Sequence, residues 1–390
     1  MRIGHALLVC GSLLPSAATA DCGGSFPAFL DGLRAEAESR GIDGAVAAGF
    51  LAGARLDPAV IRADRAQGVF RKDFIAFSRA LISRGRLETG RARAAEFADV
   101  FDRAARDHGV PRGVLLALWA FETDYGQVQG DFNTRDALVT LAHDCRRPGL
   151  FRPQVFAAME LWRRGDFDPD RTTGAWAGEI GMVQMLPADI LKNGVDGDGD
   201  GHVRLKTSAP DALLSGARML AGLGWRPGEP WLQEIVVPPT LDWSLTGLGH
   251  RMTTGEWAAL GVTAREGSLA PGLPASVLLP MGRRGPAFMA YPNFDVFFEW
   301  NQSFVYVTTA AYFATRLEGA PVYLAGDPEP GLSGEQMIRL QERLQALGHD
   351  VGAIDGILGE RTRKAVQAEQ QRLGLPADAW PTPALLAALD

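Results

Sequence analysis

Apolar and polar residues alternate along most of this chain with the three- and four-residue spacing of amphipathic helices. The spacing holds from residue 26 to about 107, and it returns at 137–142, 155–162 and 304–317. Between 231 and 289 the pattern changes to short apolar runs separated by Pro and Gly, which favours strands and loops. The sequence therefore predicts a mainly α fold with a small β-containing insertion.

One segment, 111–126, is apolar on every side rather than on one face. Its run 114–121 has no polar residue, Pro111 suits the first turn of a helix, and Gly126 suits its end. Such a helix belongs in a core. Glu122 follows the run directly, and a buried carboxyl is costly unless it is paired, protonated or used. Burial also raises a carboxyl pKa, so Glu122 is either a general acid or a structural group satisfied by a neighbour.

An acidic, glycine-rich loop at 196–201 partly matches a calcium-binding loop. Its acids fall at the first, third and fifth positions, its glycine at the sixth, and a His at the seventh would give its backbone carbonyl. Position twelve is Thr207, where an EF-hand needs Glu. Asp211, just beyond it, is the candidate for the missing ligand. The predicted ligands of a structural calcium or sodium ion are Asp196, Asp198, Asp200, His202 and Asp211. The alternative is a metal-free acidic turn before a helix.

The first twenty residues read as an export signal. A polar start and an apolar stretch at 6–14, too short to span a bilayer, lead to a small-x-small cleavage site at 18–20. The mature chain is then expected to start at Asp21 and to be periplasmic. Cys10 faintly suggests a lipid-anchor site, but the Val before it and the short segment upstream argue against acylation.

Cleavage there leaves Cys22 and Cys145 in the mature chain. Two cysteines in an exported protein favour a disulfide, and the alternative is two free thiols. No other long apolar run exists, so the mature chain is expected to have no transmembrane segment.

At 390 residues the chain has room for two or three domains, and its formal net charge is −7. Nucleic-acid-binding domains usually carry a basic face, so a nucleic-acid partner is not expected. A Pro- and Gly-containing linker at 327–331 precedes a compact helical unit of about sixty residues. This unit is too small for a catalytic site of its own and looks like an appended binding module.

Four short motifs stand out between residues 26 and 317. They are the Glu-Thr-x-x-Gly segment 122–126, the glycine-rich loop 174–187, the Asp-Gly-Asp-Gly of 198–201 and the Asn-x-Ser-x-x-Tyr of 301–306. Together they resemble, in order, the motifs of the lytic murein transglycosylase B family, which implies a lysozyme-like, α-rich catalytic domain. The tail resembles a three-helix peptidoglycan-binding module. The implied domains are a signal peptide at 1–20, a catalytic domain at 21–325, a linker at 326–331 and the module at 332–390.

The resemblance implies cleavage of the β-1,4 bond between N-acetylmuramic acid and N-acetylglucosamine in peptidoglycan strands, with formation of a 1,6-anhydromuramic acid end. Ordinary glycosidases use two carboxylates. Asp124 faces away from Glu122 on a helix, and Glu179 in the glycine-rich loop stays open as a second acid. A single group suits the implied reaction, with Glu122 acting first as acid and then as base and with no cofactor.

The resemblance also places Gln184 and Asn301 beside the glycan, where amides can donate to and accept from sugar groups. Tyr125 and Tyr306 offer stacking faces and a hydroxyl. The alternatives are amides that satisfy loops and tyrosines that fill the core.

Two positions depart from the family pattern, with Ala175 in place of a frequent Ser and Trp300 in place of a frequent Tyr. Ala175 removes one polar contact that the family pattern implies, and both departures leave the acid intact. Two other functions remain as alternatives, a hydrolytic muramidase and a non-catalytic peptidoglycan-binding scaffold. The presence of Glu122 argues against the scaffold, and oligomeric state is left open.

Overall fold

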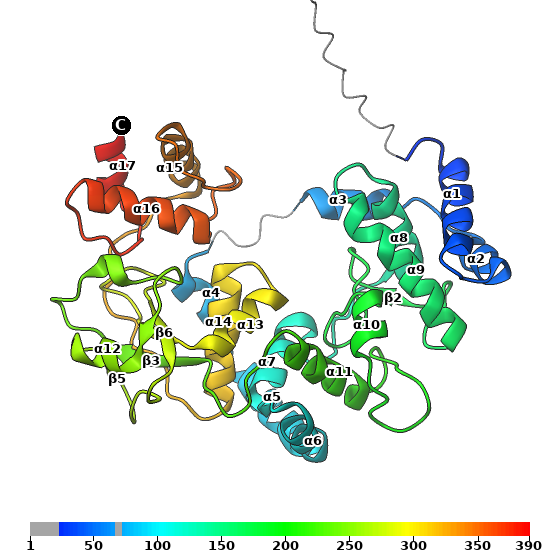
Figure 1. The fold of residues 1–390 in the computed structure, drawn as a ribbon, viewed down its shortest axis with the longest axis horizontal. Coiled ribbons are helices and arrows are strands. Elements are labelled where there is room, and N and C mark those ends of the chain that lie inside the picture. Colours follow the sequence, from blue (N-terminus) through cyan, green and yellow to red (C-terminus); the bar gives the residue numbers. More distant parts are fainter. Residues whose placement is uncertain (1–22, 67–71) are drawn as a thin grey trace, which may run out of the picture.

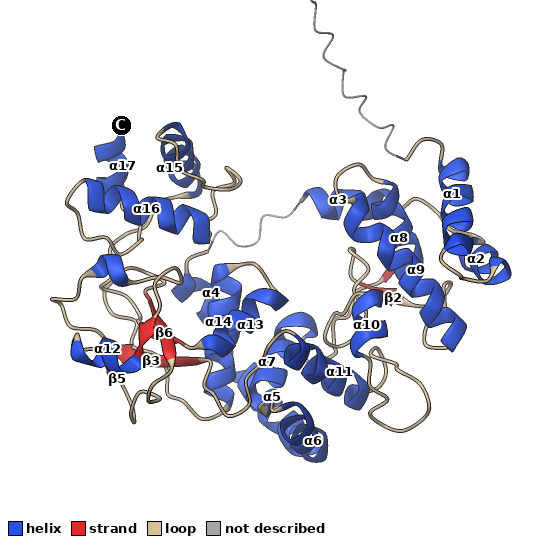
Figure 2. Cartoon of the chain, in the orientation of Figure 1, coloured by secondary structure: helices blue, strands red, loops and turns tan. Residues whose placement is uncertain are grey.

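A computed structural model of the chain describes residues 23–66 and 72–390. The protein is mainly helical, as the sequence predicts (Figure 1, Figure 2). It has a five-stranded antiparallel sheet and a two-stranded one formed by β1 (Phe132–Asn133) and β2 (Thr173–Gly174). The predicted signal peptide, Cys10 and Cys22 lie outside the described residues. Within those residues, none of the helices combines the length and apolar character needed to cross a bilayer.

One hydrophobic core is shared by the first three helices and three later ones, which lie together on one side of the molecule (Figure 1). Asp43 and Asp57 cap the starts of α2 and α3 by accepting backbone N–H groups, as short acidic residues do at helix N-termini. These helices are α1 (Phe26–Ser39), α2 (Gly44–Leu51), α3 (Pro58–Arg65), α8 (Thr134–His143), α9 (Pro148–Arg164) and α10 (Pro187–Asn193).

A second core surrounds α7 (Arg112–Thr123), the apolar helix predicted from the sequence. Residues 113–120 of α7 are all buried. The helix packs closely along α14 (Phe304–Leu317), and a Cβ added at Gly113 would lie 2.7 Å from the carbonyl oxygen of Ala314. Other helices that contribute to this core are α4 (Phe74–Leu81), α6 (Ala98–His108), α11 (Ala209–Gly222) and α13 (Pro292–Trp300), and α5 (Arg84–Glu96) packs against it.

The β-containing insertion predicted between 231 and 289 is present as a five-stranded antiparallel sheet between α11 and α13. The strand order is β4-β6-β7-β3-β5, and Met289 of the central strand pairs with Gln233 on one side and Val277 on the other. The sheet carries its own apolar cluster around Trp257 and Tyr291. Its elements are β3 (Leu232–Val236), β4 (Met252–Thr253), α12 (Thr254–Ala259), β5 (Thr263–Ala264), β6 (Pro274–Leu278) and β7 (Phe288–Ala290).

The last three helices, α15 (Gly334–Ala346), α16 (Glu360–Arg372) and α17 (Pro383–Leu389), pack around a small core of their own. This C-terminal module is fixed to the β-containing region. Arg363 Nη2 donates to the Pro280 carbonyl at 2.8 Å, and Gln367 Nε2 donates to the Thr246 carbonyl at 3.0 Å. The module is therefore docked rather than loosely tethered.

Candidate active site

The end of α7 is shaped by a strained turn that presents Glu122. Asp124 and Tyr125 both have positive φ angles, 51° and 60°, which non-glycine residues adopt at a cost. Thr123 ties the turn together, because its hydroxyl donates to the Met182 carbonyl at 2.6 Å and accepts from the Gly126 N–H at 3.0 Å. The Glu-Thr-x-x-Gly segment and the glycine-rich loop are thus joined at the residue next to Glu122.

Arg86 on α5 clamps this turn from the other side. Its Nε donates to Asp124 Oδ1 at 2.8 Å, its Nη1 donates to the Leu81 carbonyl at 2.9 Å, and its backbone oxygen accepts from the Tyr125 hydroxyl at 2.9 Å. Asp124 therefore points away from Glu122, as expected, and serves the turn.

We expect Arg86→Ala to lower the free energy of unfolding by about 1–2 kcal/mol, because Asp124 and the Leu81 carbonyl lose their charged donor. Urea unfolding measures this loss. Arg84→Ala is the matched control on the same helix, since Arg84 is 91% exposed in a surface ion pair with Glu88; its cost should stay below about 1 kcal/mol. Equal losses of unfolding free energy in the two variants would contradict the conclusion that Arg86 stabilises the turn after Glu122.

The carboxyl of Glu122 is half-buried and receives two hydrogen bonds on one oxygen. Tyr306 donates its hydroxyl to Oε1 at 2.6 Å, and Trp300 donates its indole N–H to the same atom at 2.9 Å. Both donors are uncharged. Burial raises the pKa of Glu122 above the usual carboxyl range, whereas the hydrogen bonds from Tyr306 and Trp300 act in the opposite direction. Burial thus favours the protonated form of Glu122, and the two donors favour its carboxylate form.

The two tyrosines have different positions. Tyr306 is 8% exposed and its hydroxyl meets the acid; burial and the Glu122 charge raise its pKa well above the usual value, so it stays a donor. Tyr125 is 3% exposed, packs edge-on against Trp119 and bonds to Arg86. Its surroundings are those of a core residue, which is the alternative that the sequence left open for it.

Gln184 and Asn301 lie on the two segments that flank the acid. Gln184 has a φ of 52°, and its Nε2 donates to the Gly181 carbonyl at 2.8 Å, within the glycine-rich loop. Asn301 Oδ1 accepts from the Ser303 N–H at 2.9 Å, at the start of α14. Each amide also shapes its own loop, and each side chain remains partly accessible.

Trp300 is a functional candidate that sequence reasoning missed, since it was noted only as a departure from the family pattern. Its position directly before Asn301 was the available signal. A Tyr there offers a hydroxyl and a Trp offers an indole N–H, so both residue types can donate to a carboxyl.

Glu179 also belongs to this region. Burial is the largest cause that raises its pKa, and the negative charge of Glu122 adds to the rise. Backbone N–H groups of Glu179 and Ala177 and the charge of Arg147 act in the opposite direction and lower its pKa. A role for Glu179 as a second acid stays a prediction.

Three of the five predicted metal ligands come together. Asp196, Asp198 and Asp211 place carboxylate oxygens within 4.8 Å of one another. Asp200 instead pairs with Arg204 at 2.6 Å, and the ring of His202 bonds to Asp166 at 2.9 Å; the prediction for His202 concerned its backbone carbonyl.

The donor set of this cluster fits a hard cation. Asp211 is fully buried and accepts N–H groups from Gly197 at 2.8 Å and Arg204 at 2.7 Å, while Asp196 accepts from Gly199 at 2.7 Å. Among the cluster's described contacts no Arg or Lys side chain bonds Asp196, Asp198 or Asp211. Carboxylate oxygens are the kind of ligand that calcium prefers.

Cys145 is exposed and unpaired within the described ranges. Its expected partner, Cys22, lies outside them. Near this point the His143 ring bonds to the Gly24 carbonyl at 3.2 Å, which brings the start of the described chain beside the segment that carries Cys145. The disulfide remains a prediction.

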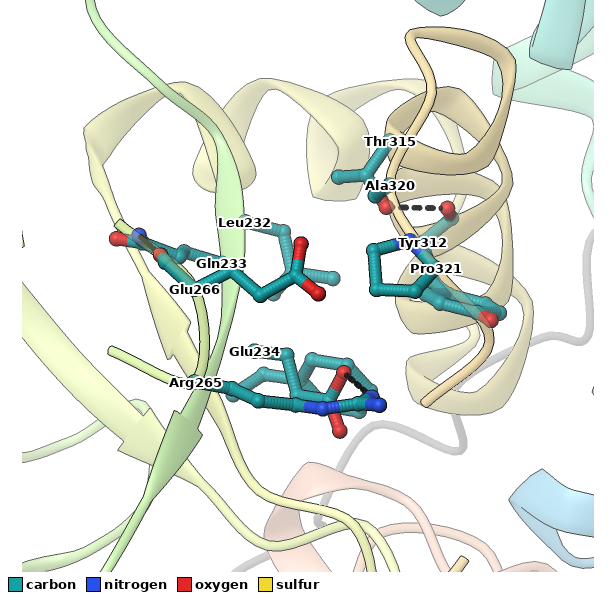
Figure 3. Close-up of a pocket in the computed structure, with 10 residues that line it drawn as sticks. Leu232, Gln233, Glu234, Arg265, Glu266, Tyr312, Thr315, Ala320 and Pro321 are labelled. Atoms are coloured by element: carbon teal, nitrogen blue, oxygen red, sulfur yellow. Dashed lines mark hydrogen bonds and ion pairs between the residues drawn. The ribbon is translucent and has the colours of Figure 1, made fainter. Parts of the chain in front are cut away.

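A cleft of about 920 Å³ lies beside the acid, between Trp300, Asn301 and Ser303 on one side and Gly356, Leu358 and Trp380 of the C-terminal module on the other. A separate cavity of about 200 Å³ lies between β3 and α14 (Figure 3). An ion pair between Arg265 and Glu234 at 2.7 Å forms one of its walls, and it contains none of the predicted site residues. The larger cleft is the one that adjoins the candidate site.

Comparison with known proteins supports the resemblance seen in the motifs. A family described as "Transglycosylase SLT domain" matches residues 25–315, and one described as "Putative peptidoglycan binding domain" matches 333–389. Membrane-bound lytic murein transglycosylase B of Escherichia coli is 28% identical over 210 residues, which cover 53% of this chain and 57% of that protein. The match thus spans little more than half of that relative.

Two solved structures extend the comparison. SltB3 of Pseudomonas aeruginosa, in complex with NAG-anhNAM-pentapeptide, is 38% identical, with a TM-score of 0.86 over 94% of this chain and 100% of that one. The Escherichia coli transglycosylase Slt35, in complex with calcium, is 24% identical, with a TM-score of 0.64 over 74% of this chain and 92% of that one, and it shows the fold alone. The chain belongs to the transglycosylase SLT domain family that includes lytic murein transglycosylase B, and it carries a C-terminal domain of the peptidoglycan-binding family.

Proposed function

We propose that this protein is a lytic transglycosylase that cleaves the bond between N-acetylmuramic acid and N-acetylglucosamine in peptidoglycan strands, with Glu122 as acid and base. The observation that carries the proposal is the environment of Glu122, a half-buried carboxyl held on one oxygen by two uncharged donors, Tyr306 and Trp300. Because Oε1 already accepts two hydrogen bonds, the proton belongs on Oε2. Membership of the family supports the assignment.

The reaction then needs one carboxyl, which acts first as acid and then as base. Glu122 gives it to the glycosidic oxygen as the bond to C1 of the muramic acid residue breaks. The C6 hydroxyl of the same residue closes onto C1, and its proton passes to the Glu122 carboxylate. No water is consumed, and the product ends in a 1,6-anhydro ring. Tyr306 and Trp300 stabilise the carboxylate between the two transfers and so keep its basicity moderate.

The glycan is positioned by groups around the acid. Gln184 and Asn301 supply amides that can donate to and accept from hydroxyl and acetamido groups. The cleft next to Asn301 has room for more than one sugar. The C-terminal module is proposed to bind peptidoglycan, and the partner of the whole protein is the cell-wall polymer.

A structural cation is proposed at Asp196, Asp198 and Asp211. An ion there would offset part of the negative charge of the three carboxylates and brace the loop before α11, and it has no step in the reaction. The relative Slt35 has been solved with calcium, which makes calcium the first ion to test. Export to the periplasm, directed by residues 1–20, completes the proposal.

The alternative is a muramidase that admits water and hydrolyses the same bond. Mass spectrometry of fragments released from purified peptidoglycan separates the two, because an anhydro product is lighter by one water. We expect anhydromuropeptides as the main products. Products with the mass expected for hydrolysis would show that the protein is a muramidase rather than a transglycosylase. If no fragments are released, the non-catalytic peptidoglycan-binding scaffold is favoured.

A further inference from the structure

The connection between α13 and α14 supplies both hydrogen-bond donors of Glu122. Trp300 is the last residue of α13, and Tyr306 lies in the first turn of α14. The indole nitrogen and the hydroxyl oxygen lie 2.9 and 2.6 Å from Oε1 of Glu122. Only residues 301–303 separate the two helices. The placement of both donors therefore depends on how the start of α14 is held.

Phe304, the first residue of α14, is held from two sides. Its ring packs against Phe298 of α13, with the ring centroids 6.4 Å apart. From the C-terminal module, the guanidinium carbon of Arg363 lies over the same ring, 4.3 Å from its centroid. A cation in this position is attracted by the negative face of the ring. Because Arg363 Nη2 also donates to the Pro280 carbonyl at 2.8 Å, the guanidinium is fixed between the β-containing region and α14.

The burial of Arg363 is not explained by an ion pair. The residue is 8% exposed, and its Nε atom is buried without a hydrogen-bond partner among the described residues. Glu360 and Asp378 act on the guanidinium only through their charges. A buried charge is costly unless it is paired and hydrogen-bonded. The contact that the buried guanidinium does make is the one with the Phe304 ring.

The rest of the module keeps Arg363 at a fixed distance from α14. Trp380 is 6% exposed and belongs to the same apolar core as Tyr306. Its indole N–H donates to the Glu329 carbonyl at 2.9 Å, and a Cβ added at Gly331 would lie 2.7 Å from its ring. The module is therefore packed into the core that surrounds α7.

We propose that Arg363 is a positioning residue for the reaction, because by holding the Phe304 ring it fixes the start of α14 and, with it, the Tyr306 hydroxyl on Glu122. This inference rests on the proposed function, in which Glu122 is the acid and base. The module that is proposed to bind the wall then has a second role, which is to support the active site. A small displacement of a group at the reacting centre can cost a large part of the rate.

The test separates the chemical step from wall binding. With short soluble glycan strands as substrate, Arg363→Ala in the full chain is expected to lower kcat about three- to tenfold and to change KM by less than about twofold. Co-sedimentation with insoluble peptidoglycan should equal that of the wild type, because the guanidinium is buried. Arg363→Lys keeps a cation for the ring and should retain kcat within about twofold. The readout is the rate of anhydro product release, followed by mass spectrometry.

Three further variants make the test specific. Gln367→Ala removes the hydrogen bond to the Thr246 carbonyl and leaves the contact between Arg363 and Phe304 in place, so kcat should stay unchanged. Phe304→Leu removes the ring but keeps an apolar side chain, and should repeat the loss of kcat even if Arg363→Ala does not fold. The double variant of Arg363→Ala and Phe304→Leu should lose no more than the larger single loss, because both changes remove one contact.

An unchanged kcat in Arg363→Ala, with only a lower melting temperature, would overturn the proposal and leave Arg363 a docking residue. Equal losses of kcat in Arg363→Ala and Gln367→Ala would also overturn it, since docking in general would then set the rate. Either result together with an inactive Glu122→Gln would refute this inference alone. Retained activity in Glu122→Gln would refute the proposed function itself.

Discussion

Glu122→Gln is expected to reduce the release of anhydromuropeptides by at least about a hundredfold. General acid–base groups contribute about 10²–10⁴-fold to rate, and here the same group serves both proton transfers. Gln has the size of Glu and keeps an oxygen that accepts from Tyr306 and Trp300, so the fold should remain. The measurement is the initial rate of release from purified peptidoglycan at the wild-type pH optimum.

The control for this variant separates chemistry from binding. Co-sedimentation of Glu122→Gln with insoluble peptidoglycan should equal that of the wild type, because the C-terminal module is unchanged. The melting temperature should stay the same or rise, since a neutral side chain now occupies a half-buried position. Full activity in this variant would show that Glu122 is neither the acid nor the base of the reaction.

The second large effect is expected at Asp211. This carboxylate is fully buried and accepts backbone N–H groups from both ends of the acidic loop, at Gly197 and Arg204. Asp211→Ala leaves these donors unpaired, so we expect the free energy of unfolding to fall by about 3–5 kcal/mol. Urea unfolding in the presence of a chelator measures this loss without any contribution from a bound ion.

The same residue tests the cation. Wild-type protein is expected to melt at a higher temperature when calcium is added, because an ion that binds only the folded state stabilises it. Asp211→Asn should lose this response, whereas Asp200→Asn should retain it, since Asp200 lies outside the cluster and pairs with Arg204. If calcium leaves the wild-type melting temperature unchanged, the cluster is a metal-free turn.

The helices and the buried setting of Glu122 were predictable because they depend on local pattern. The apolar run 114–121 allows only a core helix, and the Pro- and Gly-rich texture of 231–289 favours strands. The contacts that tune Glu122 were not predictable in this way. Trp300 donates a hydrogen bond to Glu122, from which it is separated by 178 positions in the sequence. Arg86 donates to Asp124, which lies 38 positions away. Such contacts depend on how α5, α7 and α13 pack against one another, which the local spacing of residues does not indicate.

The candidate metal site was likewise only partly predictable from the sequence. The spacing of the acids identified the loop, and the prediction that Asp211 folds back agrees with where its side chain lies. The spacing also included Asp200 as a ligand. Its side chain instead forms an ion pair with Arg204, four residues later in the sequence, which the spacing of the acids did not predict. The spacing of acidic residues thus identifies candidate metal ligands, and ion pairs with other side chains determine which of these residues lie in the cluster.

The docking of the C-terminal module bears on how the enzyme meets an insoluble polymer. A module on a free tether lets a catalytic domain search every bond within reach of the anchor point. Here Arg363 and Gln367 hold the module against the β-containing region, and Arg283 pairs with Asp378 across the same boundary. With the module bound to the wall and Glu122 as the acid, as proposed, each binding event would hold Glu122 at one distance and in one orientation. Successive cuts would then require release and rebinding, or sliding of the whole molecule along the strand.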